Sequence, residues 1–303
     1  MNIASFVQPI LAVALSPLLL GVINRTKALA AGRSGPPLLQ SYYDIAKLLR
    51  KGAVYSHTTC WVFRAGPVVG LSAVLMTTLL VPLGGSAAPL AFQGDLVFLA
   101  YLLGLMRFFT VLAALDTGSS FEGMGASREV QFSALAEPAL LLGLAAVARL
   151  TGSLSLSEMY ATLSPASLVA AGPALVLVAG ALLVVFLAEN ARVPVDDPNT
   201  HLELMMIHEV MVLDHGGPDL AFITYGAALK LWVLGALLVG IILPVRTGQP
   251  WLDVAVTIAG LLGLAVVTGV IESTMARLRL VRVPQLLAGA GVLAALALVL
   301  VLR

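Results

Sequence analysis

Apolar residues occur along this chain in long continuous runs, without the alternation of period two that marks half-buried strands. Each run has about 20 residues, the length that an α-helix needs to cross a hydrocarbon core of about 30 Å. The pattern predicts an all-α membrane protein in which residues 1–303 form a single transmembrane domain. About eight spans are expected, approximately at 3–24, 65–83, 96–115, 131–149, 168–188, 220–243, 251–271 and 283–302.

Composition agrees with a membrane-spanning chain. Hydrophobic residues make up 59% of the sequence and charged residues 11%, whereas soluble domains carry about 25% charged residues. The net charge of +1 gives no reason to expect nucleic-acid binding. One cysteine, Cys60, excludes a disulfide within the chain. It also excludes an iron–sulfur cluster held by this chain alone, because such clusters need about four thiolates.

Charged residues gather on one side of the expected membrane. Most of the 17 Lys and Arg residues lie in the odd-numbered loops, which the positive-inside rule places in the cytoplasm. Both chain termini are therefore expected outside. Most of the 16 acids, and all four histidines, lie on the same face or in the spans leading from it, which the rule does not require. We expect this face to dock a partner or to admit ions.

The first cytoplasmic loop contains an amphipathic stretch. A helix is expected between the Gly-Pro pair at 35–36 and Gly52. Gln40, Asp44 and Lys47 share one face of it, because they are spaced by about one helical turn. Two interpretations stay open, an interfacial helix with a solvated polar stripe and a cavity-lining helix beneath a docked partner.

The third loop, 116–129, is rich in glycine and is expected to be a tight loop. Its Gly-x-Gly pattern is a weak signal for a nucleotide site because no strand precedes it. Glu137 follows, about two turns into the fourth expected span. A carboxylate inside a membrane is costly and by default functional, so we expect Glu137 either to pair with a base such as Arg107 or to be protonated.

The fifth loop is acidic. Pro194 and Pro198 impose extended or turn geometry on the residues before them. Crowded carboxylates raise one another's pKa values, which suits proton uptake, although a solvated acidic loop is the alternative. We expect Asp196 and Asp197 to face the cytoplasm, so that reversing their charges would release a docked soluble module.

Three histidines near this loop, His201, His208 and His215, are spaced by seven residues. On a continuous helix neighbouring members would lie about 10 Å apart. One metal ion cannot bridge that gap, so no metal site is expected.

Two bases, Arg107 and Lys230, lie near the middle of expected spans. They either form a polar track for protons together with membrane carboxylates such as Glu272, or merely neutralise acids on neighbouring helices. The candidates for an ion path or coupling are Arg107, Glu137, Glu189, Arg192, Asp196, Asp197, Glu203, Glu209 and Lys230. The candidates for a cavity or docking surface are Arg33, Gln40, Asp44, Lys47, Arg128, Glu129, Arg277 and Arg279.

Four loop motifs together resemble one family over nearly the whole chain. They are Arg33-x-Gly35-Pro36 followed by Gln40, Asp44, Lys47 and Leu48; Arg128 followed by Glu137; Ala188-Glu189 followed by Arg192-x-Pro194-x-Asp196-x-Pro198 and Glu203-Leu204; and Arg277-x-Arg279. The family is that of the membrane subunit shared by respiratory complex I, where it is subunit 1, and the membrane-bound nickel–iron hydrogenases.

Departures from the complex I pattern indicate the branch. Complex I members typically read Phe-Asp-Leu-Pro where this chain has Val195-Asp196-Asp197-Pro198. The segments 115–129 and 193–214 are similar to the formate hydrogenlyase and hydrogenase 4 version.

This resemblance implies a subunit of the inner (cytoplasmic) membrane that has no redox centre or catalytic role of its own. A nickel–iron centre and iron–sulfur clusters would belong to partner subunits. The partners would be the large and small subunits of a soluble nickel–iron hydrogenase, iron–sulfur subunits and antiporter-like membrane subunits. The chain would anchor the redox arm and link electron transfer to the translocation of protons or sodium ions.

Two other functions stay open. The same fold in a quinone-reducing, complex I-like enzyme would place Gln40, Asp44 and Arg128 near a quinone headgroup. An independent secondary transporter would instead show internal repeats and broken helices in both halves, and the sequence shows neither.

Overall fold

The structure, a computed structural model, describes residues 3–197, 206–244 and 247–303. Within these residues it confirms an all-α membrane protein with eight helices that are long and apolar enough to cross a membrane. They are α1 (Val7–Ala30), α3 (Trp61–Thr78), α4 (Asp95–Asp116), α5 (Ser120–Thr151), α8 (Gly172–Glu189), α9 (Gly217–Ile242), α10 (Pro250–Thr274) and α11 (Val283–Leu302). The orientation of the termini stays a prediction.

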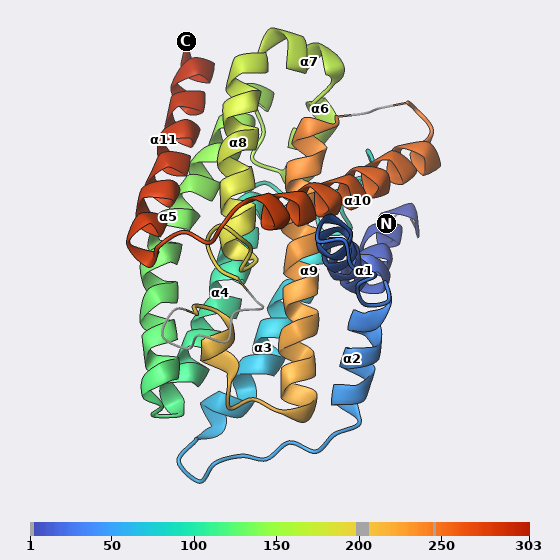
Figure 1. Ribbon diagram of the computed structural model, residues 1–303. Coiled ribbons are helices and arrows are strands. Elements are labelled where there is room, and N and C mark those ends of the chain that lie inside the picture. The colour runs from blue at the N-terminus through green and yellow to red at the C-terminus, as the bar shows by residue number, and fades with distance from the viewer. Residues whose placement is uncertain (1–2, 198–205, 245–246) are drawn as a thin grey trace.

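Shorter elements join these helices. In the first loop, α2 (Gln40–Leu49) confirms the expected amphipathic helix, and none of its residues is buried. Two short helices, α6 (Leu156–Thr162) and α7 (Pro165–Ala170), connect α5 to α8. In Figure 1, α7 and the C-terminus lie at one end of the bundle, and the blue loop between α2 and α3 lies at the other. The remaining elements are the 3₁₀ turns η1 (Ile3–Phe6), η2 (Glu209–Val212) and η3 (Leu280–Arg282).

The centre of the bundle is α9. Of its most apolar 18 residues 78% are buried, against 22–56% in the other spans. It packs against α1, α2, α3, α8 and α10. In Figure 1, α10 crosses α9 at a steep angle, and it packs along α1. A helix enclosed on all sides should be apolar all round, which makes a lysine within α9 notable.

The third loop differs from the expectation. A glycine-rich loop over 116–129 was expected, but α5 begins at Ser120, so most of the segment is helical. Gly125 therefore serves helix packing and not a loop. A Cβ atom at this position would lie 3.0 Å from the carbonyl oxygen of Ile207. Glycine here lets the first turns of α5 press against the segment 206–216. Glu137 therefore lies much farther along its helix than two turns.

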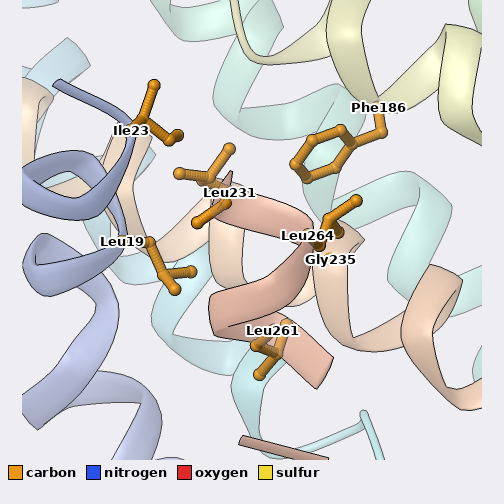
Figure 2. Close-up of a pocket in the computed structure, with 8 residues that line it drawn as sticks. Leu19, Ile23, Phe186, Leu231, Gly235, Leu261 and Leu264 are labelled. Carbon is orange, nitrogen blue, oxygen red and sulfur yellow. The ribbon is translucent and has the colours of Figure 1, made fainter. Parts of the chain in front are cut away.

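A small apolar cavity of about 10 Å³ lies between α1, α8, α9 and α10. Figure 2 shows leucine, isoleucine and phenylalanine side chains from these helices around this space, with Gly235 beside Leu264 at one side of it. Its volume is about that of one water, but polar partners are missing from its lining, so it is expected to stay dry. The lining residues are Leu19, Ile23, Phe186, Leu231, Gly235, Leu261, Leu264 and Ala265.

Close packing between α6 and α9 gives a first prediction. A Cβ at Gly240 would lie 2.5 Å from Cε1 of the Tyr160 ring. That ring is buried, and its hydroxyl donates to the Leu237 carbonyl at 2.7 Å, so it cannot move aside easily. Gly240→Ala should therefore destabilise the protein by about 1–3 kcal/mol, measured as a lower melting temperature in detergent.

The matched control is Gly263→Ala in α10. Apart from the neighbouring backbone of its own helix, no atom of the described residues lies within 4 Å of the Cβ that this change would add. Glycine inside a helix is less favourable than alanine, so this variant should melt at or above the wild-type temperature. Equal melting temperatures for the two variants would contradict the packing argument.

Candidate functional site

Arg107, in the middle of α4, is surrounded by carboxylates from two other helices. Its Nε donates to Oε1 of Glu129 at 2.9 Å, and Nη2 donates to the two oxygens of Glu189 at 2.5 and 2.6 Å. Nη1 contacts Oε1 of Glu137. The Arg107 side chain is only 9% exposed, and a buried charge is tolerated only when it is paired. Three carboxylates therefore fix the position of this guanidinium.

The second intramembrane base joins the same group. Lys230 of α9 places Nζ 2.7 Å from Oε2 of Glu189, and both side chains are buried. Glu189 ends α8 and is shared between Lys230 and Arg107. One carboxylate thus connects three helices, which explains a lysine inside the most enclosed helix.

The group extends into the loops at this end of the bundle. Oε2 of Glu129 lies 3.1 Å from Nε2 of His208, and Nδ1 of the same imidazole lies 3.4 Å from Oδ2 of Asp196. Oδ1 of Asp196 in turn lies 3.0 Å from Nη2 of Arg277. We call the connected set the central network. Its members are Arg107, Glu129, Glu137, Glu189, Asp196, His208, Lys230 and Arg277.

Electrostatics at the loop end follow from this geometry. Burial alone would lower the pKa of His208, but the Glu129 and Asp196 carboxylates outweigh it and raise that pKa above its usual value. Burial would likewise raise the pKa of Asp196, and the hydrogen bond and charge of His208 outweigh it, so this pKa is lowered. Each group stabilises the charged form of the other.

A cleft opens at the opposite end of the network. It has a volume of about 540 Å³ and lies between α4 and α5. Glu137, Arg107 and Glu189 line it, and Glu137 has a 48% exposed side chain. Its apolar lining consists of Val97, Ala100, Tyr101, Leu103, Gly104, Leu105, Phe108, Leu140 and Leu141. The network therefore runs from the loops to a cleft on the side of the bundle.

A separate charged cluster lies at the ends of α1 and α10. Lys27 places Nζ 2.8 Å from Oε2 of Glu272, and Nη1 of Arg192 lies 3.4 Å from Oε1 of the same carboxylate. The Glu272 side chain is fully buried. Here α10 approaches α1 closely, since a Cβ at Gly269 would lie 3.0 Å from the Ile23 carbonyl oxygen. This cluster fastens the steeply crossing α10 to α1.

Comparison with known proteins places the chain in a family. Residues 1–303 match the sequence model of the NADH dehydrogenase family, which is the family of complex I subunit 1. The chain belongs to this family. It is a multi-pass membrane protein, and the resemblance noted in the sequence is confirmed.

Two members from Escherichia coli (strain K12) indicate the branch. Formate hydrogenlyase subunit 4 is 32% identical over 286 residues, which cover 92% of each chain. Hydrogenase-4 component C is 33% identical over 286 residues, covering 91% of this chain and 88% of the relative. A chain in the structure of the membrane-bound sulfane sulfur reductase, an archaeal respiratory membrane complex, shares the fold. Its TM-score is 0.84 at 20% identity, over 98% of both chains.

The structure brings together most of the candidates for an ion path. Arg107, Glu137, Glu189, Asp196 and Lys230 meet in the central network, and Glu137 pairs with Arg107 as expected. Arg192 belongs instead to the Glu272 cluster, and Asp197 and Glu209 are half-buried on either side of the undescribed residues of the fifth loop. Glu203 lies outside the described residues.

Asp196 is buried within the chain, whereas the docking role expected for it requires an exposed side chain; the side of the membrane on which it lies stays a prediction. This residue is 2% exposed and contacts Arg277 and His208. Its Oδ2 also accepts the backbone N–H groups of residues 207 and 208 at 3.2 and 3.1 Å. These donors compensate for its burial. A charge reversal at Asp196 would therefore disturb the interior and would not probe a docking surface.

The surface candidates differ in exposure and contacts. Arg33, Asp44, Lys47 and Arg279 are exposed, and Gln40 is half-buried and donates to Asp44 at 2.8 Å. Glu129 and Arg277, by contrast, belong to the buried central network. Arg128 is half-buried and donates to the Met206 carbonyl at 2.8 Å, so it attaches α5 to the segment 206–216.

Sequence reasoning missed His208 and Lys27. It considered His208 only as a metal ligand, although a histidine between two acid-rich segments is a signal for a charge pair. Lys27 was considered only as one of the basic residues that predict the membrane orientation. Its position at the end of a span, like that of Glu272, is the only local hint of their contact.

Breaking the Lys230–Glu189 pair gives a second prediction. Lys230→Met leaves Glu189 with Arg107 as its only basic partner in the central network. Removal of one partner from a buried ion pair costs about 3–5 kcal/mol, so the yield and the melting temperature of the membrane protein should both fall. Arg149→Met, at an exposed position in α5, is the control and should behave like the wild type.

A double variant separates charge from packing. Lys230→Met combined with Glu189→Gln removes both charges of the pair, so it should lose less stability than the sum of the two single changes. Strict additivity of the two losses would show that this ion pair makes no energetic contribution.

Proposed function

We propose that this chain is the integral membrane subunit of a membrane-bound nickel–iron hydrogenase complex of the formate hydrogenlyase or hydrogenase 4 type. It anchors the soluble redox arm and links electron transfer to the translocation of protons or sodium ions. The relatives named formate hydrogenlyase subunit 4 and hydrogenase-4 component C support this, because the shared region covers 92% and 88% of their lengths.

The proposed partners lie on two sides of the chain. The hydrogenase large and small subunits and the iron–sulfur subunits dock at the cytoplasmic loops, and antiporter-like subunits pack beside the chain in the inner membrane. The nickel–iron centre and the iron–sulfur clusters belong to these partners. The single Cys60, whose Sγ lies 2.9 Å from Asp116, is too few thiols for a cluster of its own.

The observation that carries the coupling role is the continuity of the central network. It joins the loops, where a redox arm would dock, to the cleft between α4 and α5 through contacts of 2.5–3.4 Å and the Arg107–Glu137 contact. In a poorly solvated interior, charges at such distances interact strongly. A change of charge or position at the loop end therefore alters the pairing of Arg107, and through it that of Glu137.

The proposed ion path uses these residues in sequence. Asp197 and Glu209 form its acidic entrance in the fifth loop, and Glu203 and Arg192 of the same loop are assigned to the path from the sequence. Glu189, Arg107 and Lys230 form its middle, and Glu137 forms its exit at the cleft. Alternation of Arg107 between its carboxylate partners would change which of them binds a proton.

Isolation of the complex tests the partner assignment. A tag on this chain, followed by purification in mild detergent, should yield a complex that contains nickel, iron and the hydrogenase subunits, detected by metal analysis and mass spectrometry. A nickel-free complex that reduces quinones would contradict the proposal, and so would a chain that is stable and transports a solute alone.

Glu137 tests the coupling role. Glu137→Gln keeps the shape and a hydrogen-bond acceptor for Arg107 but removes the titratable proton, so proton movement per hydrogen evolved should fall in membrane vesicles. Glu158→Gln is the matched control, because Glu158 also accepts side-chain hydrogen bonds, from Gln93 and Ser153, but lies outside the network. Normal proton movement in the Glu137 variant would reject a role in the ion path.

A further inference from the structure

His208 occupies an unusual position between two carboxylates. Nε2 faces Oε2 of Glu129 at 3.1 Å, and Nδ1 faces Oδ2 of Asp196 at 3.4 Å. A neutral imidazole has one N–H group and one lone pair, whereas an ionised carboxylate only accepts hydrogen bonds. In the neutral form one ring nitrogen would therefore direct its lone pair at a carboxylate oxygen. While both carboxylates are ionised, only the imidazolium satisfies both contacts.

The charge balance of the central network leads to the same conclusion. Counted by formal charge, its four carboxylates face three bases, so the set carries one excess negative charge while His208 is neutral. The carboxylates are Glu129, Glu137, Glu189 and Asp196, and the bases are Arg107, Lys230 and Arg277. A proton on His208 makes the network neutral, and neutrality is favoured where charges are poorly solvated.

We propose that His208 is the residue through which the central network binds a proton. The protonated imidazole supplies the positive charge that makes the network neutral, and it passes its proton to Glu129. This inference rests on the proposed function and adds a specific entry point for the proton. It also assigns a role to the segment 206–216, because the position of that segment determines whether the imidazole reaches its two carboxylates.

The transfer is balanced within the protein. The Nε2–H bond of the imidazolium breaks, an O–H bond forms at Oε2 of Glu129, and both residues become neutral. Arg107 then loses one of its three charged partners and retains Glu137 and Glu189. The side chain of His208 is 23% exposed, so its imidazole can take up the next proton from water at the loops.

A small cavity extends this site toward α8. It measures about 10 Å³ and is lined by Glu129, Ser133, Glu189 and His208, together with apolar residues that include Leu287 of α11. This is about the volume that one water needs, and four of the lining side chains are polar. A water here would connect the imidazole to Glu189 as well as to Glu129.

Charged groups from several elements of the described chain act on His208. Glu129 of α5 and Asp196 raise its pKa, whereas burial and Lys230 of α9 lower it, and the carboxylates prevail. The Glu189 carboxylate of α8 also interacts electrostatically with His208. Arg277, beyond α10, acts on it through Asp196, whose pKa the Arg277 charge helps to lower.

The other described histidines provide contrasts. His215 is stacked on Phe63 with ring centroids 3.9 Å apart, and burial lowers its pKa, so it packs as a neutral ring. His57 is exposed in the first loop. His57→Gln is therefore the matched control for His208→Gln.

Stability against pH tests proton binding in the purified complex. Because the folded-state pKa of His208 is raised, its stabilising contribution is complete below the unfolded-state pKa of about 6.5 and is lost as pH rises through the folded-state value. His208→Gln should lower the melting temperature of this subunit at acidic pH and remove that part of the pH slope. His57→Gln should retain the wild-type slope. An unchanged slope in His208→Gln would overturn the proposal.

Proton movement in vesicles tests the transfer step. His208→Lys keeps a positive charge at this position but cannot pass a proton near neutral pH, so the complex should assemble while proton movement per hydrogen evolved is lost. If Glu137→Gln lowers proton movement and His208→Lys does not, the transfer role of His208 is rejected and the proposed function stands. If neither variant lowers it, the proposed function is rejected together with this inference.

Discussion

The pairing of Arg107 with Glu129, Glu137 and Glu189 is the interaction on which the arrangement of the bundle depends. A guanidinium with 9% exposure, in the middle of a membrane-length helix, is strongly unfavourable alone, and each buried carboxylate has the same difficulty. Bringing α4, α5 and α8 together lets these charges compensate one another. Glu189 also pairs with Lys230, so α9 is drawn into the same constraint.

The same carboxylates determine how the loops are held. Asp196 accepts two backbone N–H groups from the segment 206–216 and contacts Arg277 beyond α10. Apolar packing around Phe132, Val195 and Leu287 supports the same region. The loops are thus bound to the membrane helices by polar contacts whose strength depends on charge state. This property is what a coupling element between a redox arm and an ion path requires.

Two groups of charged residues hold different helices together. The central network joins α4, α5, α8 and α9, and the Glu272 cluster fastens α10 to α1 and to Arg192. Since Arg192 and Asp196 lie on the same short segment after α8, a movement of this segment would affect both groups. The half-exposed Glu137 marks where the central network leaves the interior, in a cleft that a neighbouring membrane subunit of the complex could cover.

The sequence by itself determined the class of the protein and the residues available for its chemistry. Span length and charge asymmetry are local properties, so eight membrane helices, an amphipathic first-loop helix and the candidate acids and bases follow from residue order, and the loop motifs indicated the family. Only the tertiary structure decided which charges meet. Arg107 and Glu189 are 82 residues apart, and Asp196 turns inward because donors from two other segments surround it. Such pairings depend on how helices pack across the bundle, and no local pattern encodes that packing.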